Sequence, residues 1–140
     1  MPRHNLSYIC FLSLLLFPSK VFASPLSITT SDDGTVLAKV QTDYEPQRII
    51  ELLNDPQKMS QIDGELQVSI LGTFENCKDV EYTIPHFLMD ITYTARACLE
   101  KNRIQLTLLE SDDLSDFSSY WDIKAKDNGS EITYSIRSIP

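Results

Sequence analysis

The most regular alternation of apolar and polar residues runs from Cys77 to Cys98, on either side of a turn at residues 85–90. A period of two is typical of a strand with one buried face. Folded about the turn, the two halves have one register in which residues 79–84 meet residues 91–96 and each of these pairs joins like residues or opposite charges. The pairs are Val80–Ala95, Tyr82–Tyr93, Ile84–Ile91, Thr83–Thr92 and Asp79–Arg96. A slip of one residue would set apolar against polar residues, so the pattern predicts this antiparallel hairpin.

Two further hairpins are predicted after it. Asn102 turns the chain into a strand over 104–110, and a turn at 127–129 joins a strand around Trp121 to one over 131–139. In the first, the predicted pairs are Leu99–Ile104, Ala97–Leu106 and Ala95–Leu108. In the second, they are Trp121–Ile136, Ile123–Tyr134 and Ala125–Ile132. The sequence therefore predicts an antiparallel sheet with one apolar face.

The residues before Cys77 predict a hairpin, two short helices and one more strand. The hairpin joins 26–30 to 35–41, a helix begins at Pro46, and a second helical segment covers 57–62. The predicted inward residues are Val36, Ala38 and Val40 in the hairpin, Ile49, Leu52 and Leu53 in the first helix, Met59 and Ile62 in the second, and Leu66, Val68 and Ile70 in the strand. This order is that of an α+β fold.

Residues 1–23 have the pattern of a cleaved secretory signal peptide. Arg3 and His4 precede an apolar run over 6–17, and small residues precede a cleavage site after Ala23. The run is shorter than the roughly 20 residues that a membrane-spanning helix needs. We therefore expect an exported protein, secreted or periplasmic, that does not span the membrane.

Residues 24–140 have the length of a single domain with one core. The whole chain has 12 basic and 20 acidic residues and a net charge of −8, and its first 23 residues contain Arg3 and Lys20 but no acid. Phosphate backbones and anionic lipid surfaces repel an acidic protein. The charge argues against nucleic acid as a partner, although acidity also serves simply to keep an exported protein soluble.

Two cysteines, Cys77 and Cys98, remain after residue 23, and they face each other in the predicted hairpin. In an oxidising compartment this arrangement favours a disulfide. A pair of buried free thiols is the alternative. A redox-active pair would need the much closer Cys-x-x-Cys spacing.

Four local patterns follow one another in order along residues 26–140. They are Gly34 with 36–42 and Glu45-Pro46, 49–53 with Asn54-Asp55-Pro56, Ile84-Pro85 before 93–96, and 120–123 with 129–134. In this order and spacing they resemble the START-like branch of the Bet v 1-type helix-grip superfamily, the branch of polyketide cyclases and coenzyme Q-binding proteins. The resemblance implies a curved antiparallel sheet, with two short helices between its first and second long strands.

The resemblance also implies a pocket on the concave face of that sheet. Members of the family continue past the last strand into a long C-terminal helix that lies across the mouth of the sheet. This chain stops at Ser138-Ile139-Pro140. We therefore expect the C-terminal helix to be missing, and the pocket to be open, covered by a second subunit, or part of a truncated product.

Few residues suggest catalysis or metal binding. His86 is the one histidine after residue 23 and lies in a turn, so we expect no multi-histidine metal site. The acidic run over 110–116 lacks the glycine and the spacing of a calcium loop. We expect no metal and no cofactor. Glu110, at the end of the apolar face, is the one candidate acid or base.

The apolar face of the predicted sheet combines small and aromatic residues. Ala95 and Ala97 would leave room above the sheet, and a tyrosine hydroxyl on an apolar face needs a hydrogen-bond partner that a ligand could supply. The predicted ligand-binding residues are Tyr82, Tyr93, Ala95, Ala97, Leu106, Leu108, Trp121 and Tyr134. The alternative is that these side chains only pack on the first helix.

Three functions are therefore compatible with the sequence. The first is non-enzymatic binding of a hydrophobic small molecule, a lipid or an isoprenoid. The second is a cyclase-like enzyme of the same superfamily. The third is a protein-interaction module that uses the uncovered sheet, with a homo-oligomer as one form.

Overall fold

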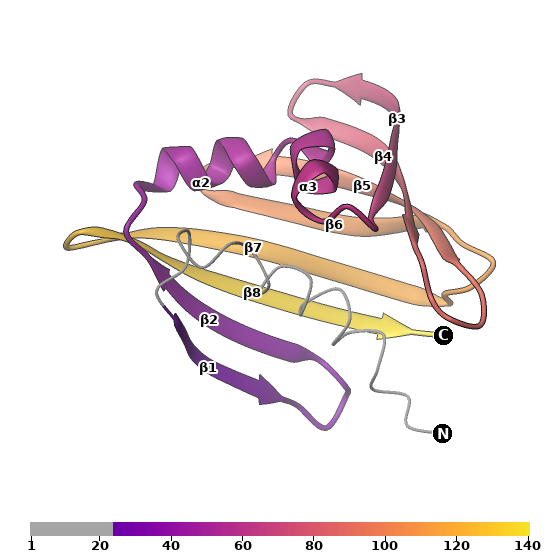
Figure 1. Cartoon of the computed structure of the whole chain (residues 1–140), viewed down its shortest axis with the longest axis horizontal. Helices are drawn as coiled ribbons and strands as arrows, with labels where there is room; N and C mark the ends of the chain where they lie inside the picture. The colour runs from indigo at the N-terminus through magenta and orange to yellow at the C-terminus, as the bar shows by residue number, and fades with distance from the viewer. Residues whose placement is uncertain (1–23) are drawn as a thin grey trace.

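A computed structural model describes residues 24–140, which form an open antiparallel sheet with two helices on one face (Figure 1). The elements are β1 (Ser24–Thr30), β2 (Val36–Thr42), α2 (Pro46–Leu53), α3 (Pro56–Ile62), β3 (Gln67–Phe74), β4 (Cys77–Ile84), β5 (Ile91–Glu100), β6 (Arg103–Glu110), β7 (Asp116–Lys126) and β8 (Gly129–Ile139). The predicted signal peptide lies outside the described residues. The predicted α+β plan is confirmed.

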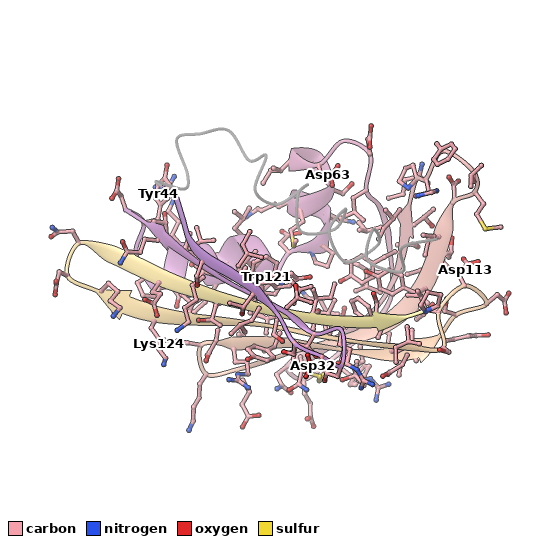
Figure 2. All side chains as sticks on the ribbon, turned by 90° about the horizontal axis from the view of Figure 1, so that it is seen from below. Asp32, Tyr44, Asp63, Asp113, Trp121 and Lys124 are labelled. Carbon is pink, nitrogen blue, oxygen red and sulfur yellow. A yellow bond between two sulfur atoms is a disulfide. The ribbon has the colours of Figure 1, made fainter. Side chains whose placement is uncertain are left out.

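The strand order explains why the helices lie where they do. The sheet has the order β1-β2-β8-β7-β6-β5-β4-β3, so β2 lies beside one edge and β3 is the opposite edge. The chain between them must cross the sheet, and α2 and α3 make this crossing, α2 against β7 and α3 against β3. The sheet curves around the helices, with β3 and β4 rising beside α3 (Figures 1 and 2). We call the face that carries the helices the inner face and the opposite one the outer face.

Both helices begin at a proline and are short. Pro46 and Pro56 occupy the first helical turn. Backbone N–H groups in that turn have no partner within the helix, so proline, which has no N–H, loses no hydrogen bond there. Asp55 caps α3, because its carboxylate accepts the N–H groups of Gln57 and Lys58, each at 3.1 Å. Within residues 24–140, β8 is the last element, so no C-terminal helix crosses the mouth of the sheet.

The buried side of α2 differs slightly from the predicted one. Ile49, Ile50 and Leu53 are buried against the sheet, whereas Leu52 is half-buried. Ile50 and Leu53 are three residues apart and lie on the same side of a helix. The helix is therefore rotated slightly relative to the prediction, and Ile50 takes the place expected for Leu52.

Two of the predicted hairpin registers are confirmed. In β4–β5, Tyr82 pairs with Tyr93 and Cys77 with Cys98. In β5–β6, Ala97 pairs with Leu106. Both follow from matching apolar residues across adjacent strands.

The predicted register of the last hairpin is wrong by two residues. Trp121 pairs with Tyr134 instead of Ile136, and Lys126 pairs with Gly129 across a two-residue turn. Because two residues are one full period of a strand, the same side chains still point inward. Gly129 was assigned to the turn, but it belongs to β8, where a Cβ atom would overlap the carbonyl oxygen of Thr42.

The core lies between the inner face and the helices. Six large aliphatic side chains at its centre are nearly inaccessible to solvent: Ile49, Val80, Ile104, Ile123, Ile132 and Ile136. Burial of each stabilises the fold by roughly 1.5–3 kcal/mol. At the β3 edge, Leu66 and Val68 pack on this core as predicted, but Ile70 is 39% exposed beside a register shift between Ile70 and Gly72.

Candidate functional site

A pocket lies on the inner face, beneath the segment that joins α2, α3 and β3. Its volume is about 90 Å³, several times the roughly 10–15 Å³ that one water needs. The lining residues from the sheet are Lys78, Tyr82, Ile84, Tyr93, Ala97, Ile104, Leu106, Phe117, Ser119, Trp121, Tyr134 and Ile136. Those from the helices and loops are Leu53, Asn54, Pro56, Met59, Asp63, Glu65, Leu66 and Pro85.

One row of side chains across the sheet forms the middle of the pocket floor. Strand pairing places Lys78 beside Ala97, Ala97 beside Leu106, Leu106 beside Ser119, and Ser119 beside Ile136. Ala97 and Ser119 are the small members of this row. They leave space above the sheet that larger side chains would fill.

Aromatic rings flank this row on both sides. Trp121 stacks on Tyr134 with 4.0 Å between ring centroids, and Tyr82 stacks on Tyr93 at 5.2 Å. Phe117 lies against Tyr93 at 4.7 Å. Figure 2 shows Trp121 near the middle of the sheet, with Asp63 on the side of the helices and Lys124 on the opposite side. The rings give the pocket rigid apolar walls.

Six of the eight predicted ligand-binding residues line the pocket: Tyr82, Tyr93, Ala97, Leu106, Trp121 and Tyr134. Ala95 and Leu108 do not. Ala95 pairs with Val80 and Leu108 and is fully buried in the core cluster. Only one of the two predicted alanines therefore borders open space.

Two polar residues of the floor, Lys78 and Ser119, are not among the predicted site residues. Lys78 lies two residues before Val80, and Ser119 two residues before Trp121, so the period of two assigns both to the inner face. Their polar character concealed this, because the prediction selected inward positions by their apolar residues. No comparable pattern in the sequence indicates which residues of α2 and α3 line the pocket.

Two polar side chains enter the pocket from β4. The Lys78 ammonium donates a hydrogen bond to the carbonyl oxygen of Asn54 at 2.7 Å. Tyr82 is 7% exposed, and burial raises the pKa of its hydroxyl well above the usual range. The hydroxyl is therefore neutral at physiological pH and able to donate a hydrogen bond to a ligand.

The raised pKa of Tyr82 predicts a loss of stability in alkali. Above a pH of about 10, the unfolded chain releases the tyrosine proton while the folded chain retains it. The contribution of Tyr82 to the free energy of unfolding should be constant below that pH and fall above it, by up to about 1.4 kcal/mol per pH unit. Urea unfolding at a series of alkaline pH values measures this slope, and Tyr82→Phe should make it shallower. An unchanged slope in the variant would show that the hydroxyl ionises freely in the folded protein.

The other candidate residues lie away from the pocket. Glu110 is exposed, at the end of β6, and does not line the pocket. His86 lies in the β4–β5 turn, with its ring 5.1 Å from that of Phe87. No group of three or more potential metal ligands occurs between residues 24 and 140. The acids that do line the pocket, Asp63 and Glu65, follow the end of α3.

The predicted disulfide is present. Cys77 and Cys98 pair across β4 and β5 with an S–S distance of 2.06 Å. Both cysteines alternate with inward-facing neighbours, so the bond lies on the outer face. It ties together two strands of the pocket floor without entering the pocket.

Comparison with known proteins identifies the fold. No protein-family model and no curated protein matches the sequence. Among solved structures, an aromatase/cyclase from a Streptomyces species has a TM-score of 0.65 and 18% identity, covering 76% of this chain and 68% of that one. A START superfamily protein from Mycobacterium smegmatis has a TM-score of 0.65 and 12% identity, covering 74% and 75% of the two chains. A STAR-related lipid transfer protein from Xanthomonas axonopodis has a TM-score of 0.61 and 11% identity, covering 81% of each chain.

These similarities confirm a START-like helix-grip fold, as the sequence resemblance implied. At such low identities they establish the fold alone. Within the described part of the chain, no helix combines the length and the apolar character needed to cross a membrane.

Proposed function

We propose that this protein binds a hydrophobic small molecule, a lipid or an isoprenoid, in the pocket of the inner face and performs no reaction on it. The observation that carries the proposal is the apolar floor of the pocket, where Ala97 and Ser119 leave open space between two aromatic pairs. Ligand pockets are typically concave and apolar with a few placed polar groups. Here Tyr82 and Lys78 supply such groups.

The fold supports the same function. The structurally similar proteins include one named for lipid transfer and one named as an aromatase/cyclase. A cyclase-like activity would require an acid or base that faces the ligand. Glu110, the candidate from the sequence, is exposed and outside the pocket lining. Of the two acids that do line the pocket, Asp63 accepts the backbone N–H of Glu65, and Glu65 is exposed. We therefore favour binding without catalysis.

We further propose that residues 24–140 act as a single exported domain, secreted or periplasmic. The signal-like pattern of residues 1–23 supports export. The Cys77–Cys98 bond supports it independently, because structural disulfides persist in oxidising compartments. Lipid extraction of protein purified from its native compartment, followed by mass spectrometry, tests the binding function directly. Material that contains no ligand, and no thermal stabilisation by added lipids, would argue against it.

Ala97, which lines the pocket, and Ala95, which is buried in the core two residues away on the same strand, provide a matched test of the pocket. Ala97→Leu should fill open space, leaving the free energy of unfolding unchanged or higher and weakening ligand binding. Ala95→Leu should overpack the core and lower the free energy of unfolding by about 1–3 kcal/mol. Urea unfolding and titration with a fluorescent fatty-acid analogue measure the two effects. Unchanged binding by folded Ala97→Leu would remove this position from the site.

A further inference from the structure

Lys78 is the only basic residue among the described residues that line the pocket. It is half-buried and lies on the inner face, where its neighbours along β4 are Val80 and Tyr82. A charged side chain in an apolar setting is unfavourable unless it is well paired. Its presence there therefore requires an explanation.

Among residues 24–140, Lys78 has one hydrogen-bond acceptor. Its ammonium donates to the carbonyl oxygen of Asn54, the residue that ends α2. An ammonium has three N–H donors, so two remain for other partners. None of the ion pairs within residues 24–140 includes Lys78. The acids of the lining, Asp63 and Glu65, both lie beyond ion-pair distance of it.

The contact with Asn54 also has a structural role. The last carbonyl groups of a helix carry partial negative charge, and a cation beside them is stabilising. α2 has no basic residue in its own last turn, so Lys78 provides this charge from the sheet. Because this role uses one donor, it leaves the ammonium able to bind an anion in the pocket.

The floor beside Lys78 suits the apolar part of such an anion. Ala97 is the nearest member of the row, and its small side chain leaves space in the pocket beside Lys78. Leu106, Ser119 and Ile136 continue the row across three more strands. At about 4.8 Å between strands, Ser119 lies roughly 14 Å from Lys78. A hydrocarbon chain along the row would keep its head at Lys78 and its tail over apolar side chains.

We propose that the ligand is an amphiphile with a single carboxylate, and that Lys78 binds this carboxylate while the apolar part lies over Ala97, Leu106 and Trp121. The inference rests on the proposed binding function and specifies the chemical class of the ligand. The carboxylates of Asp63 and Glu65 in the same lining disfavour a head group of higher negative charge, such as a phosphate.

Matched ligands that differ only in the head group test this proposal. Dodecanoate and dodecanol would be titrated by calorimetry at neutral pH, dodecanoate below its micellar concentration and dodecanol below its solubility limit. The unmodified protein should bind dodecanoate at least about tenfold more tightly than dodecanol, as expected for a charge-assisted hydrogen bond. Lys78→Met should abolish this preference by weakening the binding of dodecanoate.

Three further variants separate the charge from the fold. Lys78→Arg should retain the preference for dodecanoate, because it retains the charge. Lys78→Gln keeps a donor for the Asn54 carbonyl but has no charge, so it should lose the preference even if Lys78→Met fails to fold. Lys124→Met, at an exposed position on the outer face, should behave like the unmodified protein.

The outcomes distinguish the two levels of the proposal. If neither ligand binds to the unmodified protein, the proposed function fails and the inference fails with it. If both bind with equal affinity, or if a folded, uncharged Lys78 variant still prefers dodecanoate, the carboxylate assignment is overturned while hydrophobic binding stands.

Discussion

Gly129→Ala should lower the free energy of unfolding by about 3 kcal/mol, at the upper end of the range for overpacked positions. A Cβ atom on Gly129 would overlap the carbonyl oxygen of Thr42 and lie 2.9 Å from the Cα atom of Asp43. Both are backbone atoms that cannot rotate away as a side chain would. The clash falls where β8 pairs with β2 and where Ser130 donates to the carbonyl oxygen of Tyr44 at 2.7 Å. The chain leads from this junction directly into α2.

Gly72→Ala is the matched control for this prediction. A Cβ atom on Gly72, in the edge strand β3, would have no heavy atom within 4 Å apart from its chain neighbours. The substitution should change the free energy of unfolding by no more than about 0.5 kcal/mol. Urea unfolding of both variants gives the comparison. Equal stability of the two would show that the first residues of β8 move away from β2 at little cost.

The same glycine explains why the last register was mispredicted. Asp127, Asn128 and Gly129 together are typical of a turn, so the local pattern predicts a turn that includes Gly129. The requirement for glycine comes instead from β2, which lies more than 80 residues earlier in the chain, a contact that no local pattern reveals. The β4–β5 and β5–β6 registers were predictable because both strands of each hairpin carry matched apolar residues.

The sheet side of the pocket was more predictable than its helix side. The period of two assigns Tyr82, Ala97 and Trp121 to the inner face, and it assigns Lys78 and Ser119 there as well. It cannot show which inward residues remain uncovered, because this depends on where α2 and α3 cross the sheet. Ala95 and Ala97 are equivalent in the sequence pattern. The first is fully buried within the core cluster, and the second borders open space.

Removal of the disulfide by Cys77→Ala together with Cys98→Ala should lower the free energy of unfolding by about 3 kcal/mol. The bond joins residues 21 apart in sequence, and closing a loop of this length restricts the unfolded chain by about that free energy. The double substitution avoids leaving one reactive thiol. Because the bond lies on the outer face, ligand affinity in the pocket should change little as long as the variant remains folded.

Reduction of the unmodified protein is the control for the disulfide. Urea unfolding in the presence of a strong reductant should give the same loss of stability as the double variant, because both treatments remove the cross-link. Reduction leaves the cysteine side chains in place, whereas the variant replaces them with alanine. A much larger loss in the variant than on reduction would mean that the cysteines stabilise the fold through packing. A loss of ligand affinity in the folded variant would mean that the cross-link between β4 and β5 sets the position of Lys78 and Tyr82, and that the outer face helps to shape the pocket.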